Sequence, residues 1–392
     1  MTPRKLHQKH SRKNAPGAVR FLQLSGFNRR YDREIRAAVK KEIGKQDFVL
    51  GSALDAFEDE WAKFCGSKAA IGVGSGLSAL ELALQAAGVG RGDEVLVPSN
   101  TFIATWMAVS NIGATPVPVP TSRDDYNLIP ELLSSRVSPK TKAIVPVHLY
   151  GYPAELKRIN EVALTHNLKV IEDAAQAHGA EYRGDRIGAH SDAVAWSFYP
   201  GKNLGAFGDG GAVTTNSAEL ADKVRLLRNY GSIKKYRHES IGTNSRLDSL
   251  QCAILSVKLK YLSAFNARRE AIASLYLQRL GHLAERMEHF SLPPASSPNR
   301  VSSWHLFVIR VPDRDRVQNF LELRGIETAV HYPIPPGNQA AYSTIYSSTV
   351  DDESSSDADS LLSLPIGPHL SGSQAHRVCE TLEEFYLGAN TA

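Results

Sequence analysis

Short apolar strands alternate with helices along the first half of the chain, and this alternation restricts the fold more than any other feature. Apolar runs typical of strands fall at 69–73, 94–97, 115–119, 142–149, 169–174, 193–198 and 211–215. Helical patterns lie before or between them, at 52–65, 77–87 and 102–112 and after Pro153. Buried strands that alternate with helices form a mostly parallel sheet covered on both faces. The sequence therefore predicts an α/β fold for this region.

The pattern changes after residue 245, where two long helices are expected at 246–260 and 264–284. Beyond them we expect a strand at 304–310, a helix at 315–324, a strand at 326–332 and a closing helix at 373–388. A chain of 392 residues accommodates one large domain and a smaller one. We therefore predict a basic flexible tail over 1–20, a large α/β domain over 21–260 and a small C-terminal α+β domain over 261–392.

The positive charge of the chain is concentrated at its start. The formal net charge is +4, but the first 20 residues carry six lysines and arginines and no acidic residue. The rest of the chain has a net charge of −2, so we expect no nucleic-acid-binding face. We interpret the tail as a solvated arm, with an organelle-targeting signal or a contact to a polyanion as the alternatives.

Membrane and metal chemistry are not indicated by the sequence. No segment approaches the roughly 20 consecutive apolar residues that span a membrane. The three cysteines, Cys65, Cys252 and Cys379, are far apart and form no CxxC pair. This usage favours a reducing compartment, and we expect a cytoplasmic protein without a metal site. The acidic, serine-rich segment 351–357 is interpreted as a solvated loop.

Three features between residues 72 and 202 point to one kind of chemistry. Asp173 ends a buried strand, where ligands bind in open α/β sheets. Lys202 lies 29 residues later among glycine and apolar residues, where burial makes an amine nucleophilic. The glycine-rich turn 72–76 precedes a helix, whose first N–H groups bind anions. Each feature alone has an ordinary explanation, such as a helix cap or a lysine that reaches solvent. Together they match pyridoxal phosphate, which requires a phosphate seat, a carboxylate at the ring nitrogen and a lysine for a Schiff base.

Longer motifs extend this interpretation over nearly the whole chain, from about residue 20 to residue 390. They are VGSGLSALELAL (73–84), GDEVLVPSNTFIAT (92–105), VHLYGYP (147–153), IEDAAQAHG (171–179), SFYPGKNLGAFGDGG (197–211), RLLRNYGS (225–232) and GTNSRLDSLQ (242–251). On these motifs the chain resembles the DegT/DnrJ/EryC1/StrS family of pyridoxal-phosphate-dependent sugar aminotransferases. The resemblance implies the fold of aspartate aminotransferase, which is fold type I of the pyridoxal phosphate enzymes.

The resemblance also implies roles around the cofactor ring. Lys202 is the residue expected to form the Schiff base and to move the proton during transamination. Asp173 is expected to pair with the pyridine nitrogen, and Gln176 to lie near the ring hydroxyl. Phe102 takes the position of an aromatic ring against the pyridine face.

A second implied group would hold the cofactor phosphate. Ser197 resembles a phosphate ligand, and Gly76 and Leu77 occupy the turn that receives the phosphate. Many relatives have threonine at the position of Leu77, so only the backbone N–H can serve there. Asn244 resembles an asparagine that reaches the phosphate of the neighbouring subunit. This implies a homodimer with shared active sites.

The sugar pocket is implied less completely. Tyr199, His331 and Tyr332 are expected to border it, with core packing as the alternative for the His331-Tyr332 pair. His148 and His178 resemble packing positions of the motifs rather than catalytic residues.

The activity implied is transfer of an amino group from L-glutamate to a nucleotide-linked keto sugar. The motifs resemble the 3-aminotransferase branch, which favours a dTDP-linked 3-oxo-6-deoxyhexose. Gly337 departs from the histidine common in that branch, so a UDP-linked 3-oxo sugar and a dTDP-linked 4-oxo sugar remain alternatives. A non-catalytic regulator of the same fold is a further alternative. A related dehydratase would carry histidine in place of Lys202.

Overall fold

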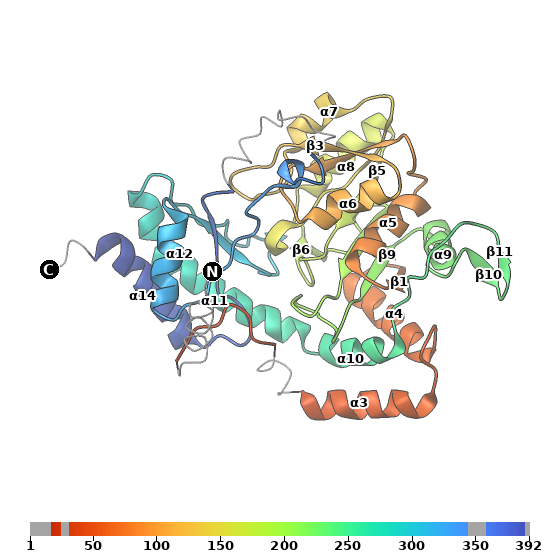
Figure 1. Cartoon of the computed structure of the whole chain (residues 1–392), viewed down its shortest axis with the longest axis horizontal. Coiled ribbons are helices and arrows are strands. Elements are labelled where there is room, and N and C mark those ends of the chain that lie inside the picture. The colour runs from red at the N-terminus through yellow and green to blue at the C-terminus, as the bar shows by residue number, and fades with distance from the viewer. Residues whose placement is uncertain (1–16, 25–30, 344–357, 389–392) are drawn as a thin grey trace.

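The computed structural model describes residues 17–24, 31–343 and 358–388 and is built around one seven-stranded sheet (Figure 1). The strands follow the order β1 (Ala69–Val73), β9 (Gly211–Thr215), β8 (Ala193–Ser197), β5 (Lys169–Asp173), β4 (Thr141–Ile144), β2 (Glu94–Pro98) and β3 (Thr115–Val119). Strand β9 runs in the opposite direction to the other six strands of this sheet. The prediction of a mostly parallel sheet is therefore confirmed.

Helices cover both faces of the sheet because alternate strand residues point to opposite sides. Ile71 and Val95 face a core with the helices α5 (Gly76–Ala86), α6 (Ile103–Asn111) and α9 (Ala218–Leu227). Ala70 and Val170 face the other side, which is covered by α4 (Ser52–Cys65), α8 (Leu156–His166) and α10 (Ser249–Leu259). The helix α3 (Asp32–Lys45) packs outside α10, as Figure 1 shows.

The C-terminal part has a hydrophobic core of its own. Its elements are the long helix α11 (Leu262–Arg286), the antiparallel strands β13 (Phe307–Arg310) and β14 (Leu361–Leu364), and the helices α12 (Arg314–Leu323) and α14 (Gly372–Leu387). Val19 is buried in this core and bridges to Ile326. The end of the predicted tail therefore packs against the small C-terminal layer.

Two expectations about secondary structure are corrected. The strand expected at 326–332 is reduced to two isolated bridges, one between Ile326 and Val19 and one between Ala329 and Ser363. The strand expected at 142–149 ends at Ile144, and a 3-10 turn follows in which Tyr150 has a φ of 60°. The helix expected at 52–65 is confirmed as α4, with Gly51 as its N-cap residue.

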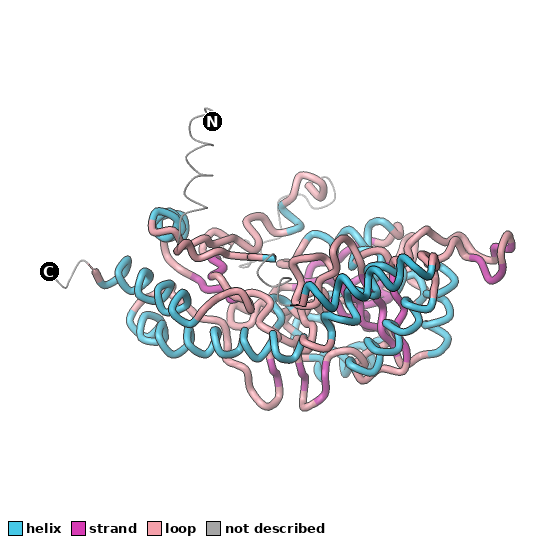
Figure 2. Tube along the Cα trace, turned by 90° about the horizontal axis from the view of Figure 1, so that it is seen from below, coloured by secondary structure: helices cyan, strands magenta, loops and turns pink. Residues whose placement is uncertain are grey.

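Several short elements complete the chain. They are η1 (Pro130–Leu132), α7 (Leu133–Arg136), η2 (Leu149–Gly151), β6 (Glu181–Tyr182), β7 (Asp185–Arg186), β10 (Ser232–Lys234), β11 (Arg237–His238), β12 (Arg300–Val301) and η3 (Pro336–Asn338). The hairpin β10–β11 projects from the main body at the end remote from the C-terminus (Figure 2). No helix among the described residues is long and apolar enough to cross a membrane.

The domain boundaries stay predictions. Most of the predicted tail, residues 1–16, lies outside the described residues, as does the acidic segment 351–357. Within the described part of the tail, Arg20 forms an ion pair with Glu327 at 2.8 Å.

Candidate active site

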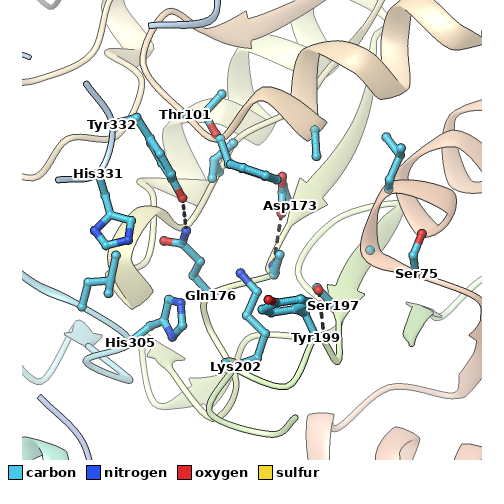
Figure 3. A pocket seen from close by; sticks show the side chains of 18 of the residues that line it. Ser75, Thr101, Asp173, Gln176, Ser197, Tyr199, Lys202, His305, His331 and Tyr332 are labelled. Carbon is cyan, nitrogen blue, oxygen red and sulfur yellow. Dashed lines mark hydrogen bonds between the residues drawn. The ribbon is translucent and has the colours of Figure 1, made fainter. Parts of the chain in front are cut away.

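A cavity of about 430 Å³ lies at the edge of the sheet where β1, β5 and β8 end. All of the predicted site residues except Asn244 line it, namely Gly76, Leu77, Phe102, Asp173, Gln176, Ser197, Tyr199, Lys202, His331 and Tyr332. The small C-terminal layer closes the opposite side (Figure 3). Parallel strands bring their carboxyl ends to one edge, so residues remote in the sequence meet there.

Lys202 enters the cavity from the turn that follows β8. Its backbone N–H donates to the carbonyl of Tyr199 at 2.8 Å, which closes this turn. Burial lowers the pKa of Lys202 to about 8, and the negative charge of Asp173 opposes part of that effect. A larger share of the amine is therefore neutral near physiological pH than in an ordinary lysine. This makes Lys202 a suitable nucleophile for a carbonyl group.

Asp173 stands at the end of β5 with both carboxylate oxygens engaged. The backbone N–H of Ala175 donates to Oδ1 at 3.1 Å. The hydroxyl of Thr105 donates to Oδ2 at 2.8 Å. Each oxygen still has a lone pair for another donor. The carboxylate can therefore accept a further hydrogen bond from the cavity.

Gln176 has a fixed amide orientation. The backbone N–H of Tyr150 donates to its Oε1 at 2.6 Å, and its Nε2 donates to the hydroxyl of Tyr332 at 3.0 Å. Burial raises the pKa of Tyr332, so its hydroxyl stays protonated at neutral pH. The Gln176 side chain thus connects the edge of the sheet to the small C-terminal layer.

The turn after β1 forms an anion seat. Ser75 caps α5 by accepting from the N–H of Ser78. The N–H groups of Gly76 and Leu77, at the start of the helix, have no partner within the helix. A Cβ at Gly76 would meet Ser197 Cβ at 2.6 Å. Glycine therefore lets the start of the helix approach the Ser197 side chain, and both can face one phosphate.

Two histidines on the far wall are neutral. Burial, reinforced by the charge of Lys202, lowers the pKa of His331 to about 4. The same causes lower the pKa of His305 well below its usual value. His331 contacts the Ser363 hydroxyl at 2.8 Å through Nδ1, and His305 contacts Asn203 Oδ1 at 3.1 Å. Both rings are hydrogen-bonding groups rather than cations at neutral pH.

Aromatic rings frame the entrance. Phe102 is half exposed, and its ring lies 5.5 Å from that of Tyr332 between centroids. Tyr199 is also more than half exposed and lies beside Lys202 in Figure 3. Such rings suit the flat face of an aromatic cofactor or the apolar face of a sugar.

The remaining predictions have mixed outcomes. His148 and His178 are fully buried and do not line the cavity. His148 bonds Glu172 at 2.8 Å, and His178 bonds the Ser197 carbonyl at 2.9 Å. Asn244 is exposed and lies outside the cavity of its own chain, so its role stays a prediction.

Three residues at or beside the cavity were not predicted from the sequence. Thr105 bonds Asp173, and His305 and Arg269 line the cavity from the C-terminal part. Thr105 lies inside a quoted motif, but nothing local marks its contact with a residue 68 positions away. No sequence signal identified the other two.

The cavity fits pyridoxal phosphate on its donor set. Lys202 provides the amine, Asp173 a carboxylate with free acceptor capacity, and the start of α5 with Ser197 provides the anion seat. These residues converge on one cavity from three separate segments, namely the start of α5, the end of β5 and the segment 197–202.

Comparison with known proteins agrees with this geometry. The DegT/DnrJ/EryC1/StrS aminotransferase family model matches residues 29–383. The chain is 47% identical to "dTDP-3-amino-3,4,6-trideoxy-alpha-D-glucose transaminase" of Streptomyces venezuelae, over 94% of this chain and 96% of that protein.

Two solved structures are similar. S. venezuelae DesV in complex with a ketimine intermediate superposes with a TM-score of 0.91 at 47% identity, covering 94% of this chain and 98% of that one. NtdA of Bacillus subtilis with bound cofactor PMP gives 0.87 at 31% identity, covering 94% and 86%. The chain therefore belongs to the DegT/DnrJ/EryC1/StrS aminotransferase family, and it is a pyridoxal-phosphate-dependent aminotransferase.

Proposed function

We propose that this enzyme transfers the amino group of L-glutamate to C3 of a dTDP-linked 3-oxo-6-deoxyhexose. The products are 2-oxoglutarate and the corresponding 3-amino sugar nucleotide. The observation that carries the proposal is the position of Lys202, whose amine lines the cavity with Asp173 and whose pKa is lowered to about 8. The name of the S. venezuelae relative supports the nucleotide and the carbon.

Each cavity residue has a part in this reaction. When bound, pyridoxal phosphate supplies a carbonyl carbon and an electron-accepting ring. Lys202 Nζ would hold the cofactor covalently and, once displaced by an amino substrate, would move a proton as a general base and acid. Asp173 would hold the proton on the ring nitrogen. The N–H groups of Gly76 and Leu77 and the Ser197 hydroxyl would hold the phosphate.

Several polar side chains line the part of the cavity that we assign to the substrate. Tyr332 and Gln176 are hydrogen-bonded to each other, and His331 and Tyr199 also line the cavity. Neutral imidazole and phenol groups can donate to and accept from sugar hydroxyls. We assign the sugar ring to this side, where the fixed groups would select which ring carbon faces Lys202.

We further propose a homodimer with shared active sites. The hairpin β10–β11 projects from the body (Figure 2), and Tyr236 and Ile241 in this region are 83% and 98% exposed. Phe48, Val49 and Phe207 are also partly exposed apolar side chains. A second copy would cover such surface, and Asn244 would then reach the partner's phosphate seat. The scattered, buried free cysteines support a cytoplasmic enzyme.

A substrate comparison tests the proposal. Purified enzyme is supplied with glutamate and with one of three sugars: a dTDP-linked 3-oxo-6-deoxyhexose, its 4-oxo isomer, or a UDP-linked 3-oxo sugar. Product mass and 2-oxoglutarate release are measured. We expect efficient amination of the dTDP-linked 3-oxo sugar. Efficient amination of only the 4-oxo isomer, or only the UDP-linked sugar, would contradict the assignment. A protein that binds the cofactor and aminates none of the three would favour a regulator.

A further inference from the structure

The carboxylate of Asp173 is supported by two buried threonines from one neighbouring segment. Thr105 Oγ1 donates to Asp173 Oδ2 at 2.8 Å, and Thr101 Oγ1 lies 3.1 Å from Thr105 Oγ1. Thr101 and Thr105 are 2% and 1% exposed, so water does not substitute for either hydroxyl. Figure 3 shows Thr101 and Asp173 on the same side of the cavity, above Lys202.

The direction of these hydrogen bonds follows from proton counting. A threonine hydroxyl has one proton and two lone pairs. Thr105 gives its proton to Asp173. In the contact between the two threonines, Thr105 must therefore accept and Thr101 must donate. The result is a directed chain from Thr101 through Thr105 to the carboxylate.

The local fold directs this chain of hydrogen bonds toward Asp173. Thr101 ends the loop after β2, Phe102 is the N-cap residue of α6, and Thr105 lies in the first turn. A helical threonine commonly bonds a carbonyl of its own helix. Thr105 instead bonds a carboxylate 68 positions away on β5. Neither threonine was needed to explain the binding of the phosphate or of the sugar.

We propose that Thr105, polarised by Thr101, is a positioning residue that holds the Asp173 carboxylate in the orientation that faces the pyridine nitrogen of the cofactor. Hydrogen bonds donated to a carboxylate stabilise its charged form and are stronger than bonds between neutral groups. A second hydroxyl behind the first strengthens the donor, because hydrogen-bond chains polarise one another. This inference rests on the role proposed above for Asp173.

The test combines variants with a readout other than turnover. Thr105→Val removes the hydroxyl at nearly constant shape, Thr105→Ser restores it, and Thr101→Val removes only the outer donor. Ser110→Ala is the control, because Ser110 lies on the same helix and its hydroxyl contacts Tyr342 at 3.1 Å instead. Each apoenzyme is loaded with cofactor labelled with ¹⁵N in the ring. The nitrogen signal reports ring protonation at neutral pH, and kcat/KM is measured in parallel.

We expect Thr105→Val to shift the nitrogen signal toward the unprotonated form and to lower kcat/KM by about tenfold to a hundredfold, as for a lost hydrogen bond to a charged group. Thr101→Val should shift the signal in the same direction by a smaller amount. Thr105→Ser and Ser110→Ala should keep the wild-type signal.

An unchanged nitrogen signal in folded Thr105→Val would overturn the inference. If Thr105→Val does not fold, Thr101→Val takes its place in the test. An unchanged nitrogen signal in Thr101→Val would then overturn the inference. The variant Asp173→Asn distinguishes a failure of this inference about Thr105 from a failure of the role proposed for Asp173. If Asp173→Asn loses ring protonation while Thr105→Val does not, only the inference fails. If Asp173→Asn keeps a protonated ring and wild-type turnover, the proposed role of Asp173 fails.

Discussion

Two buried lysines show how different environments can produce the same lowered pKa. Burial lowers the pKa of both Lys202 and Lys258 to about 8. Lys202 lines the cavity and is influenced by Asp173. Lys258 lies on α10, is 3% exposed, and donates to the carbonyl of Gly205, with the Phe207 ring 5.6 Å from its amine. A lowered pKa therefore marks burial in both regions, and access to a cavity distinguishes the reactive amine.

Lys202 and Lys258 therefore have different roles in the protein. Lys258 holds Gly205, which ends the turn that carries Lys202. Lys202 is left to meet a ligand in the cavity, which Asp173 and Tyr199 also line. Three variants and one pH profile test whether Lys202 and Lys258 have these different roles.

The largest effect is expected for Lys202→Ala. Loss of the amine removes both the covalent attachment and the proton-transfer group, so kcat should fall by about 10⁴-fold or more. The melting temperature should stay close to that of the wild type, because Lys202 lines a cavity rather than the core. Turnover near the wild-type rate would show that another lysine acts.

Asp173→Asn should be the next most severe change. An amide cannot keep the ring nitrogen protonated, so we expect a loss on the order of 10²- to 10³-fold in kcat with the cofactor still bound. Because Asp173 raises the pKa of Lys202, that pKa should also fall further below about 8 in this variant. Single-turnover rates with glutamate measure the first effect. Rates equal to those of the wild type would remove Asp173 from the mechanism.

The pH dependence of cofactor capture tests the environment of Lys202. Only the neutral amine attacks a carbonyl, so the rate at which apoenzyme binds pyridoxal phosphate should rise with pH and level off above about 8. A lysine with its ordinary value of 10.5 would give a rate that keeps rising well past that point. Stopped-flow absorbance across this range distinguishes the two profiles.

The smallest effect is expected for Lys258→Met. The variant leaves the Gly205 carbonyl without its lysine donor, which should destabilise the fold by about 1–3 kcal/mol. Catalysis should change by less than about tenfold, since Lys258 does not line the cavity. Calorimetry and steady-state rates measure the two effects. A loss as large as that of Lys202→Ala would break the distinction between the two lysines.

The sequence predicted the sheet and the site residues at its edge better than the cavity wall that the C-terminal part forms. Strand β5 and the residues Asp173 and Lys202 lie in apolar runs and motifs that are readable locally. Strand β14 was missed because it pairs with β13 across about fifty residues of chain, and no short-range pattern signals that pairing. His305 reaches the cavity only through the packing of the small layer.

The contacts of Thr105 and Gln176 illustrate the same limit. Their side chains bond residues 68 and 156 positions away. Periodicity and spacing describe neighbours within one element, whereas these contacts depend on the fold as a whole.

The most direct test of the account is to find which lysine carries the cofactor. The enzyme is loaded with pyridoxal phosphate, reduced with borohydride, digested and analysed by peptide mass spectrometry. The account predicts a stable pyridoxyl label on the peptide that contains Lys202, with Lys258 unmodified. A label on Lys258 or any other lysine, with Lys202 unmodified, would contradict the central claim.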